Sequence, residues 1–339
     1  MYRLKYVGLV LLLVSFVMVE AQQTNLNLFL VKQHGKYGYI DRTGKIVIPC
    51  RFDDAQYFKD GIAPVKVGGK KGKFGYIDQT GKFIIPPRYE NAVYFSYGVA
   101  VVVINNNCRY IDKTGNYVVP VQSNDVTPFF EGMADIGIGG KRGFIDTTGR
   151  IVVTPQFEWA FPFQEGLALV KTFEPNGYSG KWGYINKTGR FVIPAQFTRA
   201  ESFSEGLAAV QLDEKSEFGY IDKTGNYVIP PKFDIAYDFS EGLAAVYPES
   251  SKKGGFIDKT GKMIIRPQFQ VSNLSTFVDG LASVGVGRNY GYINRSGKFI
   301  VLPQFDDAQP FYQGLGRVTI GKKFGWIDTT GKFIWKLSE

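Results

Sequence analysis

Residues 218–230 read FGYIDKTGNYVIP, and related phrases recur along the chain. Nine copies align on the isoleucine that precedes a turn, and successive copies lie 34 to 40 residues apart. The aligned positions are Ile40, Ile77, Ile111, Ile145, Ile185, Ile221, Ile257, Ile293 and Ile327. A period of this length indicates a repeat architecture, in which each unit buries its apolar surface against its neighbours.

The centre of each copy predicts a β-hairpin. Asp222 can accept hydrogen bonds from backbone N–H groups two residues further on, and Gly225 tolerates the positive φ of a type I turn followed by a G1 bulge. Aromatic and β-branched residues flank the turn, as is typical of strands. Pro230 ends the second strand because it cannot donate to the ladder. A connector (residues 233–239), a second turn (240–242) and a third strand of Leu, Ala and Val complete the unit.

Side-chain alternation predicts sheets that are covered on both sides. Phe218 and Tyr220 fall on one face of their strand and Ile221 on the other, and both faces are apolar. We therefore expect an all-β fold, a tandem array of nine β-meander or hairpin repeats of about 36 residues. Whole units at both ends, three clear strands per unit and nine units favour an open superhelical stack. A propeller-like ring is the alternative, although propellers usually have four to eight four-stranded blades.

The N-terminus has the pattern of a signal peptide. Arg3 and Lys5 precede an uncharged apolar run at residues 7–19, and Ala21 predicts cleavage before Gln22. The run is shorter than the roughly 20 residues of a membrane span; an uncleaved N-terminal anchor is the alternative. We expect residues 1–21 to be a signal peptide and residues 22–339 to form the repeat domain, with no transmembrane segment after cleavage. The protein would then be periplasmic, cell-surface or extracellular.

The fifth copy carries the most specific phrase. Residues 181–186 (KWGYIN) followed by residues 189–194 (GRFVIP) resemble the WG repeat, also called the KWG repeat, of bacterial proteins. The resemblance covers essentially the whole mature chain, and it implies a β-rich, often exported repeat without a defined activity. Copies three, four and seven depart from it with Cys108, Arg142 and Gly254 at the aromatic position. Copy three also has Arg109 in place of the glycine, which predicts irregular packing there.

Two chemical interpretations of the recurring Asp-x-Thr-Gly turn are weak. Residues 112–115 (DKTG) match the phosphorylated aspartate loop of P-type ATPases, but Asn116 replaces the final threonine, and long membrane helices and a nucleotide domain are missing from the sequence. Calcium needs six to eight oxygens, whereas each turn offers one carboxylate. Hairpin geometry explains the motif better, so we expect no cofactor and no metal site.

The sequence also argues against an enzyme. His34 is the one histidine, so neither a Ser-His-Asp triad nor a multi-histidine zinc site can be assembled. Glycoside hydrolysis needs one pair of carboxyl groups in different environments. Acidic residues instead recur before the turn glycine, which indicates turn chemistry: Asp60, Glu131, Glu165, Glu205, Glu241 and Asp279. We expect no catalytic residues.

Charge and cysteines set further limits. The formal net charge is +9, and most lysines recur at turn positions, which favours solvated loops over a specific nucleic-acid signal. A disulfide is permitted in an exported protein. Cys50 and Cys108 occupy different places in copies one and three, so two separate buried thiols are favoured, and pairing stays open.

The departures from the repeat are the candidate specificity elements. Three non-consensus loops stand out, at residues 105–107 (NNN), 122–125 (QSND) and 173–178 (FEPNGY), although tolerance of loop variation explains them equally well. The favoured function is an exported, non-enzymatic binding or interaction scaffold for a protein or glycan of the cell envelope or extracellular space. The alternatives are a structural envelope component without a discrete ligand, and a hydrolase with an unrecognised site.

Overall fold

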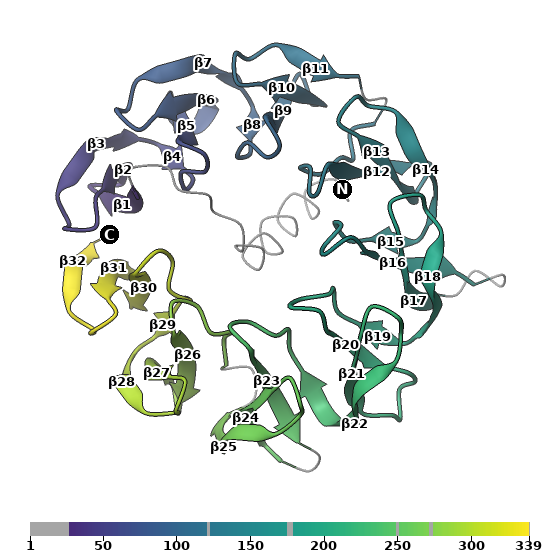
Figure 1. Cartoon of the computed structure of the whole chain (residues 1–339). Helices are drawn as coiled ribbons and strands as arrows, with labels where there is room; N and C mark the ends of the chain where they lie inside the picture. The colour runs from purple at the N-terminus through teal and green to yellow at the C-terminus, as the bar shows by residue number, and fades with distance from the viewer. Residues whose placement is uncertain (1–26, 121–122, 175–178, 249–250, 271–273, 339) are drawn as a thin grey trace.

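The computed structural model describes residues 27–120, 123–174, 179–248, 251–270 and 274–338, which form small β-sheets arranged in a ring (Figure 1). The predicted all-β repeat fold is confirmed. The one helical segment in these ranges is a 3-10 turn, η2 (Gly69–Lys71). The predicted signal peptide, residues 1–21, lies outside the described residues.

The strands form antiparallel meanders of three or four strands, and we call each meander a blade. The strands follow one another in chain order from the inner to the outer side of the ring (Figure 1). The innermost strands have two residues each: β4 (Asp54–Ala55), β8 (Asn91–Ala92), β15 (Trp159–Ala160), β19 (Arg199–Ala200) and β29 (Asp307–Ala308). Blades four and eight have a single bridge here, Val126 with Ile136 and Leu274 with Val284. The predicted connector thus supplies a short fourth strand.

The longer strands have the same order in all nine blades. The second strands are β1 (Phe29–Gln33), β5 (Ile62–Val67), β9 (Val99–Ile104), β12 (Met133–Ile138), β16 (Ala168–Phe173), β20 (Ala208–Gln211), β23 (Leu243–Pro248), β26 (Leu281–Val286) and β30 (Leu315–Ile320). The third strands are β2 (Lys36–Ile40), β6 (Lys73–Asp78), β10 (Asn107–Asp112), β13 (Lys141–Asp146), β17 (Ser179–Ile185), β21 (Phe218–Ile221), β24 (Lys253–Asp258), β27 (Asn289–Asn294) and β31 (Lys323–Asp328). The outer strands are β3 (Ile46–Phe52), β7 (Phe83–Tyr89), β11 (Tyr117–Val119), β14 (Ile151–Phe157), β18 (Phe191–Phe197), β22 (Tyr227–Ala236), β25 (Met263–Gln270), β28 (Phe299–Phe305) and β32 (Phe333–Ser338). The end of β22 also forms the inner strand of blade seven, which joins blades six and seven into one seven-stranded sheet.

The predicted hairpin lies between the third and outer strands. In blade six the register passes from Tyr220 opposite Ile229 to Ile221 opposite Tyr227, so one extra residue is accommodated at the turn. Gly225 has φ of 89°, as the G1 bulge requires. Asp222 Oδ1 accepts hydrogen bonds from Thr224 N (2.9 Å) and Asn226 N (3.1 Å). The predicted turn is therefore confirmed.

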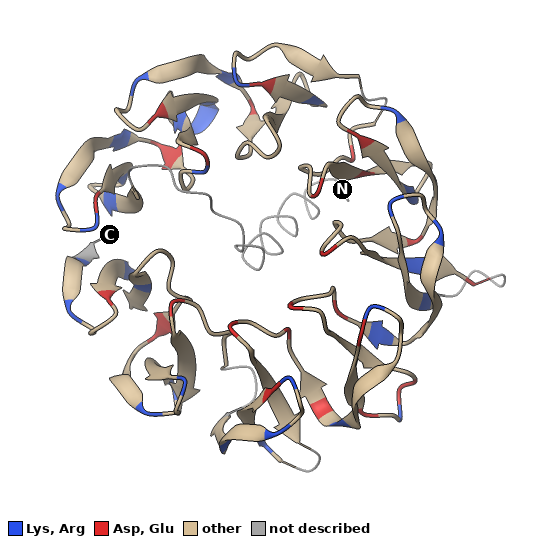
Figure 2. Ribbon diagram, viewed as in Figure 1, with Lys and Arg blue, Asp and Glu red and all other residues tan. Residues whose placement is uncertain are grey.

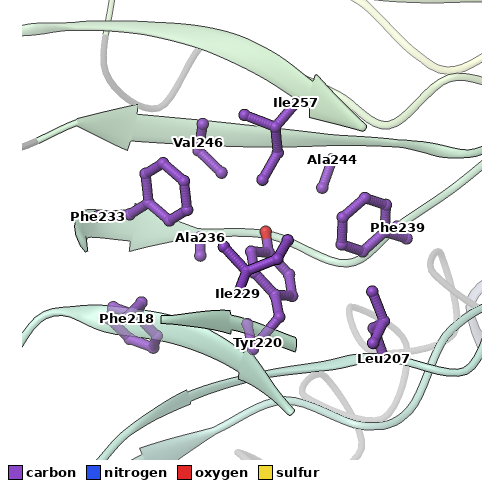
Figure 3. Close-up of a cluster of buried hydrophobic side chains, with 11 residues drawn as sticks. Leu207, Phe218, Tyr220, Ile229, Phe233, Ala236, Phe239, Ala244, Val246 and Ile257 are labelled. Carbon is purple, nitrogen blue, oxygen red and sulfur yellow. The ribbon is translucent and has the colours of Figure 1, made fainter. Parts of the chain in front are cut away.

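The hydrophobic cores lie between blades. Figure 3 shows the core between blades six and seven, where Phe218, Tyr220 and Ile229 face Phe239 and Val246 of the next blade. The Tyr220 and Phe239 rings meet edge to face at 4.9 Å. Nine such clusters are present in the described residues, one for each neighbouring pair of blades. Each sheet is covered on both sides by its neighbours, as the apolar alternation predicts.

The ninth cluster closes the ring, and it corrects the favoured open stack. It joins Phe29 and Val31 of blade one to Leu315 and Trp326 of blade nine. The Trp326 indole N–H donates to the Leu30 carbonyl (2.7 Å), a contact between residues 296 positions apart. The first and last blades lie side by side in Figure 1. In the described residues, the closing core and the Trp326 hydrogen bond join the two ends, so whole units at both ends are compatible with a closed ring. The propeller-like ring is the arrangement that forms.

The turns fall on two opposite faces of the ring because the strands of each blade are antiparallel. One face, which we call the turn face, carries the turns between innermost and second strands and the hairpins between third and outer strands. The other, the loop face, carries the loops between second and third strands and the links from each outer strand to the next blade. In the part of the chain that is described, no helix has the length and apolar character needed to cross a membrane.

Candidate functional site

The aspartate of the Asp-x-Thr-Gly motif accepts hydrogen bonds from groups of its own turn. Besides the two backbone donors, Thr224 Oγ1 donates to Asp222 Oδ1 at 2.6 Å, and this hydrogen bond holds the pKa of Asp222 below its usual range. Asn186 and Asn294 accept the equivalent bonds in blades five and eight. A neutral amide serves as well as a carboxylate, so the motif builds the hairpin.

The acidic residues before the turn glycines bridge adjacent blades on the turn face. Glu205 has φ of 54° and begins a two-residue turn, and one of its carboxylate oxygens accepts from Gly242 N of blade seven (3.0 Å). Lys259, in the outer hairpin of blade seven, donates to the Glu205 carbonyl (2.9 Å) and lies 3.0 Å from its carboxylate. The same carboxylate-to-amide contact joins Glu131 to Gly166, Glu165 to Gly206, Glu241 to Gly280 and Asp279 to Gly314. Asp60 occupies this turn position in blade two.

A second set of interblade carboxylates lies on the loop face, and the sequence reasoning missed it. Each follows the aromatic residue at the end of an outer strand and accepts from a backbone N–H in the loop of the next blade. The pairs are Asp53 with Gly69 (2.7 Å), Glu90 with Asn106 (3.0 Å), Glu158 with Gly180 (3.2 Å) and Asp306 with Gly321 (2.6 Å). The recurring Phe-Asp pair of the connector was the available signal. Most of the regular polar positions thus hold blades together.

The described parts of the three non-consensus loops lie on the loop face. Residues 105–106 form the β9–β10 loop, and Asn107 begins β10. Residues 123–125 follow β11, with residues 121–122 outside the described ranges. These two loops touch, because Asn124 Nδ2 donates to Asn107 Oδ1 (3.3 Å) and Asn124 Oδ1 accepts from Cys108 N (3.2 Å). The third loop begins at Phe173 in blade five, and its residues 175–178 are not described.

In copies four and seven, nearby side chains compensate for the missing aromatic residue. In copy four the Arg142 guanidinium lies 2.9 Å from both Asp125 and the buried Asp135, and Thr127 Oγ1 donates to Asp135 (2.6 Å). Burial raises the pKa of Asp135, and the Arg142 charge opposes that rise. In copy seven Gly254 leaves the aromatic position empty, and the buried ring of Tyr247 fills it.

The cysteines and the histidine occupy separate places. Cys50 lies on β3 of blade one and Cys108 on β10 of blade three, and both thiols are free. Burial raises the pKa of each thiol. His34 lies exposed at the β1–β2 turn on the loop face. Among the described residues, no three His, Cys, Asp or Glu side chains gather closely enough to hold a metal ion.

One acidic pair lies on the inner side of the ring. Glu201 and Asp238 belong to the connectors of blades six and seven, next to the hydroxyl contacts of Tyr184 and Tyr220. Burial, and then the Glu201 charge, raise the pKa of Asp238 to about 7. Among the described side chains, Asp238 Oδ1 is buried and has no hydrogen-bond partner. Nothing in the repeat pattern marks this pair, because Ser202 holds the position equivalent to Asp238 in blade six.

A basic part of the loop face lies on blades one and two. Two adjacent hollows of about 540 and 560 Å³ open there and share Lys66 and Lys70. Lysines therefore gather more closely than the even distribution expected from the turn positions. Figure 2 shows this basic segment at the neighbouring ends of β5 and β6.

The fold defines the class of protein, and the match to a repeat family then defines the family. The geometry defines a ring of β-meander repeats closed by packing of its first and last blades. The WG containing repeat family matches eight segments: residues 37–70, 74–108, 109–141, 143–172, 182–215, 218–247, 255–289 and 290–324. The chain belongs to this family. Each segment supplies the third and outer strands of one blade and the first two strands of the next, which is why nine blades correspond to eight whole matches.

Solved structures show only distant similarity. Hsv2p from Kluyveromyces lactis is 12% identical, with a TM-score of 0.43 over 71% of this chain and 92% of that one. Oligopeptidase B from Trypanosoma brucei is 10% identical, with a TM-score of 0.47 over 84% of this chain and 49% of that one. A streptogramin B lyase is 16% identical, with a TM-score of 0.34 over 77% and 94%. A search of curated protein sequences finds no match.

Proposed function

We propose that this protein is an exported, non-enzymatic interaction scaffold that holds a protein or glycan on the loop face of its ring. The observation that carries the proposal is that the repeated polar residues have structural contacts, whereas the irregular loops do not follow the repeat. The repeated Asp, Glu and Lys positions are engaged in turns and interblade contacts, whereas the described parts of the three loops that depart from the repeat lie on one face. Rigid scaffolds commonly present binding residues on such variable loops.

A face-blocking experiment tests the proposal. In a Cys50→Ser, Cys108→Ser background, single cysteines replace exposed residues of the loop face (Lys70, Phe173) or of the turn face (Lys45, Lys298), and each is coupled to a bulky polyethylene glycol. The untagged mature protein should capture a partner saturably from envelope or extracellular fractions. We expect tags on the loop face to abolish capture and tags on the turn face to leave it unchanged.

The same experiment separates the alternatives. A structural envelope component would show no saturable partner with any variant. Capture that is blocked only from the turn face would contradict the proposed surface. Turnover of a glycan or peptide panel that one carboxylate substitution abolishes would favour the hydrolase.

Export is tested separately. The expressed precursor should be recovered outside the cytoplasm with Gln22 as its first residue, because the expected cleavage follows Ala21. Recovery of an intact N-terminus in the membrane fraction would favour the uncleaved anchor.

A further inference from the structure

We infer that the two basic hollows on blades one and two bind an acidic polysaccharide, a sugar chain with repeated carboxylate or sulfate groups. This inference rests on the proposed function and specifies its ligand class and location. Four strands or turns bring the lysines together: Lys32 from β1, Lys66 from β5, Lys70 and Lys71 from η2, and Lys73 from β6.

The local sequence explains why lysines gather here. Residues 66–73 read KVGGKKGK, and Gly68 and Gly69 have φ of 102° and 69°. These left-handed conformations, which glycine adopts without strain, allow the chain to turn tightly into η2. Lys70 and Lys71 are consequently exposed on the loop face beside the half-buried Lys66.

Of the three carboxylates nearby, Asp53 and Glu90 pair with lysines, and Asp54 accepts a hydrogen bond from Ala55 N (2.8 Å). Asp53 pairs with Lys36 and accepts from Gly69 N, and Glu90 pairs with Lys73 and accepts from Asn105 N and Asn106 N. Within the described residues, Lys66, Lys70 and Lys71 form no ion pair. With Lys36 included, six lysines surround three carboxylates (Asp53, Asp54 and Glu90), which leaves a local excess of positive charge.

The shape and composition of the patch favour a polysaccharide. The two hollows share Lys66 and Lys70, so a ligand with evenly spaced charges can occupy both. Tyr37 lines the first hollow and offers one ring, with the Lys32 ammonium 5.2 Å from its centroid. Single-stranded nucleic acid is usually held by rows of stacking aromatics, and arginine forks favour phosphate, but neither lines these hollows. A membrane surface needs adjacent exposed apolar side chains, and the exposed large hydrophobics lie on other segments.

The corresponding loop of blade six has the opposite charge. Asp213, Glu214 and Glu217 lie there with a single lysine, Lys215. The loop face is therefore electrostatically asymmetric, and a polyanion is attracted to blades one and two and repelled at blade six.

The test uses the mature full-length chain and a triple variant, K66Q/K70Q/K71Q. A matched control, K45Q/K82Q/K298Q, removes the same charge from exposed lysines of the turn face. Binding of polygalacturonate and dextran sulfate is measured against neutral dextran, a DNA oligonucleotide and phosphatidylglycerol vesicles. We expect saturable binding of the two acidic polysaccharides, at least a tenfold loss of affinity in the loop-face variant and less than a twofold change in the control. Both variants should keep the parental melting temperature.

Other outcomes overturn the inference. Equal losses in the two variants would indicate a general charge effect, and tighter binding of DNA or of vesicles would assign the patch to another ligand class. If K66Q/K70Q/K71Q captures the partner from envelope fractions as well as the parent protein does, the inferred polysaccharide site is wrong. The scaffold proposal would still stand. If acidic polysaccharides bind as expected but no fraction contains a saturable partner, the scaffold proposal fails independently.

Discussion

At the residue scale, the tyrosine of the repeat makes a hydrogen bond that the repeat sequence does not predict. The tyrosine of the hairpin phrase packs in an interblade core and also donates its hydroxyl to a carbonyl of the next blade, as Tyr220 does to Tyr237 O (2.7 Å). Five further tyrosines make the same contact with a residue 17 positions ahead: Tyr39, Tyr76, Tyr110, Tyr184 and Tyr292. Phe144 and Phe256 replace it in blades four and seven, so the ring is the shared requirement and the hydroxyl is an addition.

Substituting Tyr220→Phe isolates that hydroxyl. The ring and its packing remain, but the Tyr237 carbonyl loses a buried donor, which should cost about 1–2 kcal/mol. A lower urea midpoint and a melting temperature reduced by a few degrees are expected. Tyr117→Phe, at a position that is 57% exposed, is the control and should leave both unchanged. Equal stability of the two variants would contradict the assigned role of the hydroxyl.

Asp238 predicts a pH dependence with a defined sign. Its pKa is about 7 in the folded protein, above its ordinary value, so the native state binds more protons than the unfolded chain between those values. The stability that this protonation contributes is present at acid pH and is lost as the pH rises through 7. The melting temperature should therefore fall between pH 5 and pH 8, and Asp238→Asn should flatten that fall. The exposed control Asp234→Asn should retain it; an unchanged profile in Asp238→Asn would be inconsistent with a titrating Asp238.

At the element scale, the glycine of the third strand explains the family phrase. The outer strand crosses directly over this position, so a Cβ added at Gly219 would lie 2.7 Å from Ile229 O. The register skips the glycine, because Phe218 pairs with Phe233 and Tyr220 with Ile229. Copy three tolerates Arg109 because, in the described residues, its outer strand β11 is short and pairs with Tyr110 and Ile111 but not with Arg109. The irregular packing predicted for this copy is thereby confirmed.

Gly219→Ala should weaken blade six. The backbone of β22 cannot retreat without losing its hydrogen bonds to β21, and we expect a destabilisation of about 2 kcal/mol or more, in the range of overpacked sites. Hydrogen exchange should show the loss of protection first in β21 and β22. The control is Lys215→Ala, which changes an exposed side chain in the β20–β21 loop next to β21 without a clash. If the protection of β21 and β22 is unchanged in Gly219→Ala, the crowding argument is wrong.

At the scale of the whole molecule, closure depends on repeating one interface nine times. The hairpin glycine of each blade packs against the outer strand of the preceding one, as Gly225 does on the Ile193 side chain. Across the ends, Gly44 lies against Ile334 of the outer strand of blade nine. Trp326 takes the tyrosine position in blade nine. Its larger ring and N–H reach Leu30 of blade one, where the described residues include no innermost strand.

Trp326→Ala should open the ring. The substitution removes an edge-to-face contact with Phe29 at 5.3 Å, a hydrogen bond and much of the closing core, and large-to-small core changes of this kind cost about 3–5 kcal/mol. Small-angle scattering should show a compact ring for the parent and a larger radius of gyration for the variant. Tyr292→Ala removes a comparable ring between blades eight and nine and serves as the internal-interface control. A ring of unchanged size in Trp326→Ala would mean that the remaining contacts suffice for closure.

The sequence by itself determined the strands, the hairpin turn and the need for neighbours on both sides of every sheet. These follow from short-range rules: glycine at a positive φ, an Asp or Asn that accepts backbone hydrogen bonds, and alternation of apolar residues. Only the tertiary structure decided that the array closes, because the curvature of a repeat array accumulates from small rotations at each interface, which no local pattern specifies. For the same reason, the gathering of the irregular loops and of the lysines of blades one and two on one face appeared only in three dimensions. Lys32 and Lys70 are far apart in the chain, and they line one hollow because two blades pack together.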